Sequence, residues 1–519
     1  MVKILIDGNA IEVKEETSIL EAAEQAGIFI PHLCFHPALT PEGNCRMCLV
    51  EIEGFPELEL ACSTKVADGM KISTQSEKVT EARKSMLEFL LAEHPLDCPI
   101  CDKAGECKLQ DYYDDYGLFD SKFNEKKEKK EKKVPIGKNL ILDRERCIMC
   151  SCCVRFLREI THTQELGILQ RGIHSEIGIY EGMPINNNYS GNLVDLCPVG
   201  AITDKDFRFK TRSWLLNRRD SICPLCSRGC NITIEYFHGF SRFEELKKVY
   251  RIKPRENLKV NGFWICDFGR YNYYYLYEDR MKGITYKKIE KESQMTWENT
   301  LNFISEKIKS LYHENKTSRI ALICSSWLSN EELFLLKKIF KDDLEIENIY
   351  LVDPLQGESD GLLLTSDRSP NTRGAKEIGI KTMPLNIGTL SKETDLIIIC
   401  GYFLVDHLKQ EELKVMLKSI ETKVLLTAHN SELDSFMDIV LPIALIAEKD
   451  GSLTNTDGFV QYFSSALKLP GESRPEWKIF IDLAKRLRLN PAYYNKFSSI
   501  KDIQKQIREE IPFFEEEIE

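Results

Sequence analysis

Apolar and polar residues alternate at the start of the chain, and this pattern predicts a small domain containing both strands and a helix. Residues 3–14 alternate around an Asp-Gly pair, which is common in tight turns, and predict a β-hairpin. Ser18 and Glu21 have the spacing of a capping box, so a helix should begin after Ser18, and Gly27 can end it. A hairpin and a helix before a cysteine-containing loop are compatible with a β-grasp ferredoxin, although they are not specific to it.

The second half of the chain alternates amphipathic helices with short apolar runs. Residues 297–315 and 331–340 have helical periodicity. Four runs rich in Ile, Leu and Val predict strands at 319–323, 348–352, 395–399 and 424–427. Apolar strands alternating with helices are typical of a parallel sheet in an α/β layer fold. The sequence shows no Gly-x-Gly-x-x-Gly after a strand, and it therefore identifies no dinucleotide site.

Length and charge add general limits. The 519 residues suggest three or four domains, at roughly 150 residues per domain. The net charge of −11, from 70 basic and 81 acidic residues, argues against a uniformly basic nucleic-acid binder. No apolar run approaches the roughly 18 residues that span a bilayer, and residues 1–7 lack the apolar core of a signal peptide. We therefore expect a folded protein of a reducing cytosol.

The cysteines change this picture, because the chain is long enough to fold without disulfides. Sixteen of the 18 cysteines precede residue 267. Cys324 and Cys400 lie at the ends of predicted strands and are interpreted as small buried residues. In a reducing compartment, clustered cysteines more often bind metal or carry out redox chemistry than form structural disulfides.

A lysine-rich stretch, 124–133, divides the cysteine-rich half. We interpret it as a solvated linker; a docking surface for an acidic partner is the alternative.

The first two groups of candidate ligands precede this stretch. The first has intervals of 10, 2 and 13 residues and consists of Cys34, Cys45, Cys48 and Cys62. Four thiolates can complete a [2Fe–2S] site, and zinc is the alternative. The second follows a helical pattern that ends near Pro95, and it consists of His94, Cys98, Cys101 and Cys107. Because three cysteines there need a fourth partner, we predict that His94 is a ligand. An imidazole in place of a thiolate makes a cluster less negative and raises its potential.

The third group begins the bacterial ferredoxin run Cys-x2-Cys-x2-Cys and ends on a Cys-Pro pair; it consists of Cys147, Cys150, Cys153 and Cys197. Two-cluster ferredoxins carry eight such cysteines. The four positions that would serve a second cluster hold Leu157, Asn187, Ser190 and Leu193 instead. This pattern indicates a two-cluster ferredoxin fold reduced to one [4Fe–4S] cluster. Cys152 fits none of the ligand positions and is interpreted as a spare thiol.

The fourth group has intervals of 2, 3 and 35 residues and consists of Cys223, Cys226, Cys230 and Cys266. It also suits a [4Fe–4S] cluster. The four groups together provide 15 cysteines and one histidine, which fills four sites of four ligands. Zinc could explain any single group, but the ferredoxin pattern of the third group argues for iron throughout.

The four groups, in this order, resemble the G subunit of NADH–quinone oxidoreductase, the respiratory complex I family, over nearly the whole chain. The segment 191–194 before Cys197 is part of the resemblance. The resemblance implies one [2Fe–2S] and three [4Fe–4S] clusters on the groups as assigned above. The fourth cluster is present only in some bacterial members of that family.

The C-terminal half is similar to molybdopterin oxidoreductases at two signatures, 368–375 and 448–461. The chain after Cys266 is too short for a complete pterin-binding fold, and no cysteine in it belongs to a recognisable ligand motif. We therefore expect a truncated, catalytically silent α/β domain without molybdopterin.

The resemblance implies an iron–sulfur electron carrier without its own substrate site or catalytic residue, working as a subunit of an NADH–quinone oxidoreductase. Its partners would be a flavin-containing NADH dehydrogenase subunit and other iron–sulfur subunits of the peripheral arm, without nucleic acid. It would be cytoplasmic and peripheral on the inner membrane, touching the membrane only through the complex. The alternatives are the electron-transfer subunit of a soluble NAD-linked hydrogenase or formate dehydrogenase, a molybdenum formate dehydrogenase chain, and a zinc-stapled scaffold.

The expected fold is multidomain α+β and α/β. The expected order is a β-grasp 2Fe–2S ferredoxin-like domain at 1–78, a helical 4Fe–4S domain with one His and three Cys ligands at 79–118, a charged linker at 119–138, a degenerate ferredoxin-like 4Fe–4S domain at 139–215, a 4Fe–4S domain of molybdopterin-oxidoreductase type at 216–280, and the truncated α/β domain at 281–519.

Overall fold

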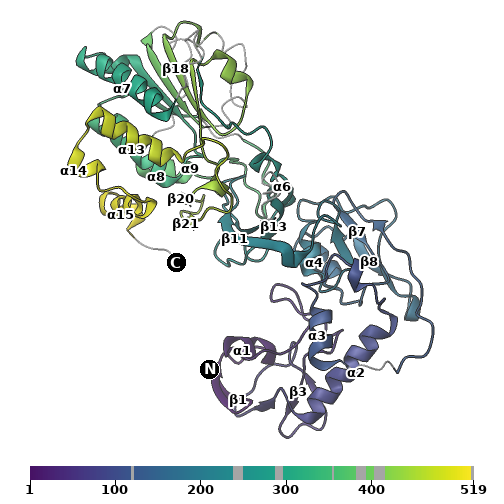
Figure 1. The fold of residues 1–519 in the computed structure, drawn as a ribbon. Helices are drawn as coiled ribbons and strands as arrows, with labels where there is room; N and C mark the ends of the chain where they lie inside the picture. The colour runs from purple at the N-terminus through teal and green to yellow at the C-terminus, as the bar shows by residue number, and fades with distance from the viewer. Residues whose placement is uncertain are drawn as a thin grey trace. The chain divides into compact units, whose positions relative to one another are not determined.

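The computed structural model describes most of the chain in two compact units, Met1–Leu216 and Asn217–Glu519. The described residues are 1–117, 122–237, 249–286, 296–352, 356–380, 393–401, 415 and 417–515. All sixteen proposed ligands lie within them, whereas the start of the expected linker, 119–121, lies outside. Figure 1 shows the helices and strands of each unit, coloured by residue number.

The first unit begins with a five-stranded sheet of order β2-β1-β5-β3-β4. Its strands are β1 (Val2–Ile6), β2 (Asn9–Val13), β3 (Leu49–Ile52), β4 (Glu59–Leu60) and β5 (Lys71–Ser73). The predicted hairpin is confirmed, since β1 and β2 pair antiparallel. The predicted capping box is confirmed as well: the Ser18 side chain accepts from the Glu21 N–H, and α1 (Ile19–Gln25) follows. Its apolar face packs with the sheet in one core.

Two helices follow, and both carry proposed ligands at their ends. The helical pattern before Pro95 is confirmed as α2 (Glu77–Glu93), with Ser76 as its N-cap. α3 (Lys108–Tyr116) begins after a loop that contains the short 3₁₀ helix η1 (Cys98–Ile100). Within the first unit, α2 and α3 contact each other.

The lysine-rich stretch is mostly exposed, as a solvated linker would be, but several of its side chains are bonded to the first unit. Lys127 Nζ donates to the carbonyls of Leu91 at 2.6 Å and His94 at 2.7 Å. Lys132 lies within ion-pair distance of three carboxylates, those of Asp97, Asp143 and Glu145. Lys127 thus holds the stretch against the end of α2, and Lys132 pairs with carboxylates of the first unit.

The rest of the first unit combines small sheets with two short helices. β6 (Val134–Pro135), β7 (Leu140–Leu142) and β10 (Ile202–Asp204) form one sheet, and β8 (Leu166–Leu169) pairs with β9 (Glu176–Ile179). The helices α4 (Cys152–Glu159) and α5 (Asn192–Leu196) contact each other. The 3₁₀ helices η2 (Gly172–His174) and η3 (Ser213–Leu215) complete this part.

The second unit begins with a three-stranded sheet formed by β11 (Leu216–Ile222), β12 (Asn231–Phe237) and β13 (Val249–Pro254). Next come α6 (Asp267–Tyr271) and a six-stranded sheet of order β14-β19-β18-β17-β15-β16. The strands of this larger sheet are β14 (Thr285–Tyr286), β15 (Ile320–Cys324), β16 (Ile349–Leu351), β17 (Leu396–Cys400), β18 (Thr422–Thr427) and β19 (Ile439–Pro442). All pairs except β14–β19 are parallel, which confirms the predicted parallel sheet.

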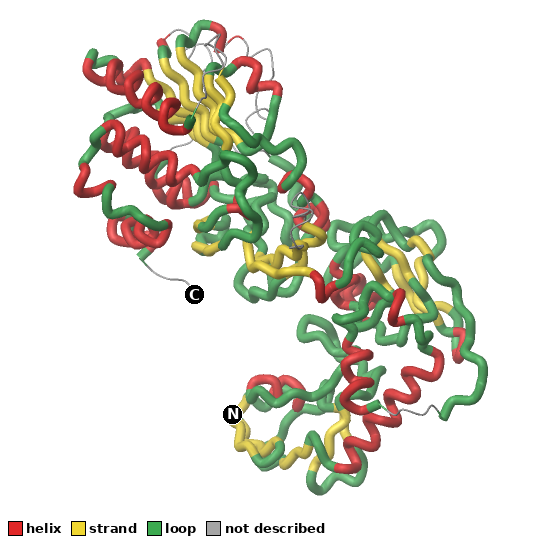
Figure 2. Tube along the Cα trace, in the orientation of Figure 1, coloured by secondary structure: helices red, strands yellow, loops and turns green. Residues whose placement is uncertain are grey.

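Helices flank the larger sheet, as Figure 2 shows in red beside the yellow strands. The helix expected at 297–315 is α7 (Trp297–His313), and it packs against α13 (Glu476–Leu487). The helix expected at 331–340 differs in one respect: α8 (Asn330–Leu336) continues as a π-helix over Lys337–Asp343. The other elements are α9 (Thr372–Ile378), β20 (Gly451–Thr454), β21 (Val460–Phe463), α14 (Pro491–Tyr494) and α15 (Ile500–Glu510).

Cys324 and Cys400 end β15 and β17, and both side chains are fully buried, as expected of core thiols. They are opposite each other in the parallel register. Among the described residues, we find no helix that is long and apolar enough to cross a lipid bilayer.

A buried charge cluster joins three helical segments of the second unit. Lys449 Nζ donates to Glu332 and to Glu476, at 2.8 Å in each case, and all three side chains are almost inaccessible to water. Burial raises the pKa of Glu476 to about 8; the charge of Glu332 adds to this effect and Lys449 opposes it. Two carboxylates therefore share one ammonium group.

This cluster should make the stability of the folded chain fall as the pH rises from about 5 to 8. The folded pKa of Glu476 lies above the unfolded value of 4.5, so the folded state binds the proton more tightly, and its advantage is lost as that proton leaves. Glu476→Gln should make the loss of stability with pH smaller. Calorimetry of the anaerobic chain would measure this as a smaller fall in melting temperature, where each kcal/mol of stability corresponds to roughly 2–4 °C.

Glu421→Gln is the matched control, because the Glu421 carboxylate is mostly exposed and pairs with Lys307 at the surface. An unchanged pH dependence in the Glu476 variant would contradict the assignment.

Candidate iron–sulfur sites

The first group of cysteines lies in the loops that surround β3 and β4. Cys45 and Cys48 precede β3, Cys62 follows β4, and all four thiols are buried. The thiols interact in two pairs: a hydrogen bond from Cys45 is the main cause that lowers the pKa of Cys34 to about 6, and Cys48 acts in the same way on Cys62. The charge of Cys34 in turn opposes ionisation of Cys62, so the two pairs are neighbours.

The second group converges on one cavity. His94 ends α2, Cys98 begins η1, and Cys107 directly precedes α3. With Cys101, these side chains line a cavity that Gly200 also borders. The Cys98 thiol is the exposed member of the group, whereas Cys101 and Cys107 are buried.

His94 has the properties of a neutral ligand. Burial lowers the pKa of its imidazole to about 4. Its Nδ1 atom is buried and has no hydrogen-bond partner within the described part of the chain. A buried polar atom without a partner costs roughly 1–3 kcal/mol. An imidazole with an unpartnered nitrogen, on a cavity that three cysteines also line, fits an iron atom as the missing partner.

Gly200 shows how closely the chain packs around the same cavity. A Cβ atom at this position would lie 2.2 Å from the Cys101 sulfur. The glycine follows the Cys197-Pro198 pair of the third group, so a loop that carries one proposed site packs directly against a ligand of another. This requirement depends on the fold and could not be inferred from sequence spacing.

The third group lines a cavity with apolar walls. Cys147 and Cys150 lie in the loop before α4, Cys153 lies in its first turn, and Cys197 ends α5. All four side chains line this cavity, together with Leu142, Ile148, Ser151, Cys152, Ile177, Val199, Ala201 and Ile202. Cys152, interpreted as a spare thiol, thus lies at the cavity and not apart from it. Burial raises the pKa of Cys147 to about 12; the charge of Cys197 adds to this effect, and the Met149 N–H and the charge of Lys130 oppose it.

The fourth group is buried in the second unit. Cys223 follows β11, Cys230 precedes β12, and the Cys223 N–H donates to the Cys230 carbonyl at 2.8 Å. Cys266 is the N-cap of α6. Burial is the main cause that raises the pKa of Cys223 and Cys230, and the charges of the other thiols of the group add to it. The four thiols are therefore mutual neighbours.

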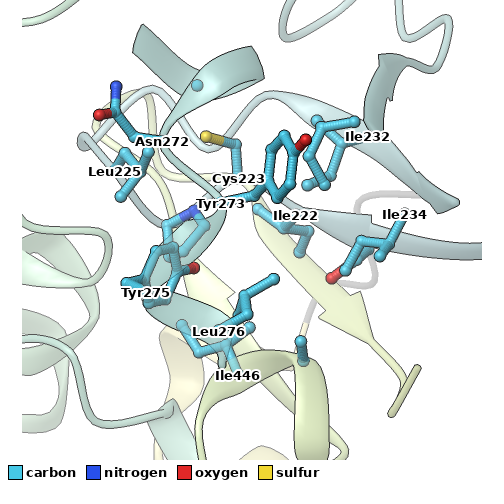
Figure 3. Close-up of a pocket in the computed structure, with 15 residues that line it drawn as sticks. Ile222, Cys223, Leu225, Ile232, Ile234, Asn272, Tyr273, Tyr275, Leu276 and Ile446 are labelled. Atoms are coloured by element: carbon cyan, nitrogen blue, oxygen red, sulfur yellow. The ribbon is translucent and has the colours of Figure 1, made fainter. Parts of the chain in front are cut away.

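Figure 3 shows the apolar surroundings of Cys223. Its thiol borders a small cavity lined mainly by aliphatic and aromatic side chains, including Ile222, Ile232, Tyr273 and Tyr275. Gly269 of α6 lies close to the same thiol, since a Cβ atom there would be 3.0 Å from the sulfur. Water is thereby kept away from this side of the group.

Left-handed backbone conformations occur within each ligand loop. Arg46, Gly105 and Gly229 have φ values of 52°, 81° and 63°, and in the third loop Met149 and Ser151 have φ values of 53° and 61°. Such conformations are uncommon for residues other than glycine and cost about 1 kcal/mol or more. They curl the chain between successive cysteines, which turns the thiols toward a common interior.

Across the described residues, no three His, Cys, Asp or Glu side chains gather closely enough to hold a single metal ion. The ligands of an iron–sulfur cluster bind two or four different iron atoms. The donor set, the apolar walls, the orphaned His94 nitrogen and the close approach of Gly200 to a thiol fit such clusters.

One residue of each signature in the second unit, Asn371 and Glu448, makes internal polar contacts. Asn371 Oδ1 accepts from the Thr454 N–H at 2.8 Å, and its Nδ2 donates to the Leu328 carbonyl at 2.9 Å. Glu448 forms a buried ion pair with Arg280, through Oε2 and Nη2 at 2.7 Å. These polar groups are satisfied by the protein itself.

Four regions of the chain match protein families, and they follow one another along the sequence. Residues 1–77 match a 2Fe-2S iron-sulfur cluster binding domain, and residues 83–122 match the NADH-ubiquinone oxidoreductase-G iron-sulfur binding region. Residues 137–203 match the ferredoxin-like domain of NADH-quinone oxidoreductase subunit 3, and residues 363–486 match molybdopterin oxidoreductase. The chain is therefore a multidomain protein with regions of the 2Fe–2S and 4Fe–4S binding types.

Three curated relatives are NADH-quinone or NADH-ubiquinone oxidoreductase subunits. The G subunit of NADH-quinone oxidoreductase from Rickettsia felis is 40% identical over 341 residues, covering 66% of this chain and 49% of the relative. The 75 kDa subunit of NADH-ubiquinone oxidoreductase from Reclinomonas americana is 40% identical over 351 residues, covering 68% and 49%. Subunit 3 from Thermus thermophilus is 34% identical over 376 residues, covering 66% and 46%.

Among solved structures, a chain of an NAD+-reducing [NiFe]-hydrogenase in the H2-reduced state is 32% identical, with a TM-score of 0.38, covering 40% of this chain and 90% of that one. The chain spans about half the length of the curated relatives it matches. With these relatives and the order of its matched regions, the chain belongs to the family of the NADH-quinone oxidoreductase G subunit.

Proposed function

We propose that the chain is an iron–sulfur electron-transfer subunit of an NADH:quinone oxidoreductase of the complex I type. It would receive electrons from a flavin-containing partner that oxidises NADH and pass them toward a partner that reduces quinone. The observation that carries the proposal is the convergence of the sixteen proposed ligand side chains into four separate groups, in a chain of this family. Its place would be the peripheral arm, on the cytoplasmic side of the inner membrane.

The first group would hold a [2Fe–2S] cluster and the other three would each hold a [4Fe–4S] cluster. The clusters supply one-electron redox chemistry when bound. The domain limits proposed from the sequence, 1–78, 79–118, 119–138, 139–215, 216–280 and 281–519, separate these sites from the α/β domain. No side chain needs to act as an acid, a base or a nucleophile.

The role of the protein is to hold the ligands, keep water away and set the local charge. Apolar walls such as Ile148 and Val199 exclude water from the third site, which strengthens every electrostatic interaction there. His94 contributes a neutral nitrogen where the other sites have a thiolate, so its cluster carries one negative charge fewer.

The α/β domain would be catalytically silent and would hold no molybdopterin. Two of its signature residues support this proposal, because Asn371 and Glu448 form hydrogen bonds to other groups of the protein. The electron-transfer subunit of a soluble NAD-linked hydrogenase or formate dehydrogenase is the alternative assembly. Purification of the native complex distinguishes them, since membrane-embedded partners support the first assembly and a hydrogenase or formate dehydrogenase subunit supports the second.

Metal analysis tests the function directly. The anaerobically purified chain should contain about fourteen iron atoms, from one two-iron and three four-iron clusters. Stoichiometric zinc in place of iron would refute the redox function, and stoichiometric molybdenum or tungsten would refute the silent α/β domain.

A pair of neighbouring cysteines tests the assignment at the third site. Cys153→Ala should remove about four iron atoms and one [4Fe–4S] EPR signal, because a ligand is lost. Cys152→Ala is the matched control in the adjacent position, and this variant should keep the four iron atoms and the EPR signal. Equal iron losses in the two variants would show that the ligand assignment is wrong.

The histidine ligand has a separate test. His94→Cys should keep the cluster and lower its midpoint potential, because a thiolate adds negative charge. EPR-monitored redox titration measures the shift. His162→Cys, which places a new thiol at an exposed position, controls for the added cysteine. An unchanged spectrum and midpoint in the His94 variant would exclude this histidine as a ligand.

A further inference from the structure

Arg155 is a fully buried arginine between two of the proposed cluster sites. It lies on α4, one helical turn after Cys152, and its side chain has no exposed surface. Lysine and arginine side chains are almost never completely buried unless they are paired. Its contacts therefore need an explanation beyond the packing of the helix.

On one side, Arg155 holds the loop of the first group. Its Nη2 donates to the carbonyl of Cys34 at 2.5 Å, and its Nη1 donates to the carbonyl of Thr40 at 2.6 Å. Cys34 is itself a proposed ligand, so the guanidinium group is bonded to the backbone of the first site.

On the other side, the same guanidinium group holds the loop of the third group. Nη2 also approaches the carbonyl of Cys150 and the Cys152 sulfur, each at 3.3 Å, and Nε donates to the Ser151 hydroxyl at 3.2 Å. Cys150 is a proposed ligand of the third site. One side chain thus touches the backbone of one ligand from each site.

The charge of Arg155 is only partly compensated by the protein. The Glu42 carboxylate approaches its Nε no closer than 3.9 Å, and Glu42 also accepts a hydrogen bond from Ser151. The remaining contacts are to carbonyl and hydroxyl oxygens and to the Cys152 sulfur. A buried cation is costly without negative charge nearby. Thiolate-bound clusters on both sides would supply that charge, and each gains a further negative charge on reduction.

We propose that Arg155 is a positioning residue shared by the first and third cluster sites, which fixes the separation of their ligand loops and raises both midpoint potentials together. This inference rests on the proposed function, because it requires clusters at both groups. A positive charge next to two clusters favours the reduced form of each, and a fork of N–H donors fixes both loops in one geometry.

Arg83 is a natural control within the same unit. It is also a buried arginine, but it donates to the carbonyls of Met47 at 3.3 Å and Leu49 at 3.2 Å. Both of these residues flank Cys48 of the first group. Removal of the Arg83 charge should therefore affect the first site and leave the third unchanged.

The experiment compares Arg155→Gln, Arg155→Lys and Arg83→Gln in the full chain, purified anaerobically. Iron content is measured first, and EPR-monitored redox titrations then give the midpoint of each cluster. Arg155→Gln should shift the [2Fe–2S] midpoint and that of the third-group cluster to lower potential. Arg155→Lys keeps the charge and should shift both less. Arg83→Gln should shift the [2Fe–2S] midpoint alone.

A second measurement reports on position. Relaxation enhancement between the reduced [2Fe–2S] centre and the third-group centre gives the distribution of their separation, which should broaden in Arg155→Gln and stay narrow in Arg83→Gln. Loss of iron from the first and third sites together in Arg155→Gln, with recovery in Arg155→Lys, would also support the shared role.

A shift confined to one cluster, or no shift with full iron content, would overturn the inference and leave the proposed function standing. Wild-type chain without iron would instead refute the proposed function, so the two failures are distinguishable.

Discussion

The inward orientation of buried thiols is the constraint on which the cysteine-rich part of the structure depends. Burial is the main cause that raises the pKa of Cys107 to about 11 and of Cys266 to about 12, and neighbouring negative charges add to it, so the protein by itself keeps these groups protonated. A metal centre reverses this preference, because a coordinating thiol is deprotonated. Left-handed residues such as Arg46 and Met149 provide the curl that the loops need.

In the first unit, the loops of the third group contact those of both the first and the second group. Arg155 connects its loop with the first group, through the carbonyls of Cys34 and Cys150. Two contacts connect it with the second group: Gly200 packs against the Cys101 sulfur, and Arg146 pairs with Asp97 at 2.7 Å. The three groups of this unit are thus held by direct contacts between their own loops. Such loops limit independent movement of the sites, which favours constant distances between redox centres.

Local patterns predicted the elements well, because short-range periodicity and capping determine them. The hairpin at 3–14, the capping box at Ser18 and the helix expected at 297–315 depend on residues close in sequence. Contacts between distant segments were not predictable. The sequence of 124–133 does not show that Lys127 bonds to the Leu91 carbonyl, and nothing local singles out Arg155, because its acceptor at Cys34 is 121 residues away. Ligand spacing suggested four groups, but it could not show that Cys152 borders the same cavity as the ligand run itself.

The second signature of the α/β domain has a structural use that needs no pterin. Gln461 ends this signature, and its side-chain amide forms hydrogen bonds with two residues in the loops of the fourth group. Its Nε2 donates to the Gly229 carbonyl at 3.0 Å, and its Oε1 accepts from Asn231 Nδ2 at 2.5 Å. Gly229 and Asn231 flank Cys230, so this glutamine supports the backbone on both sides of a proposed ligand. These two bonds use one N–H donor and one oxygen lone pair of the amide, and both are made inside the protein. Gln461 of the signature therefore supports the loop of a proposed cluster site, and this contact by itself requires no pterin.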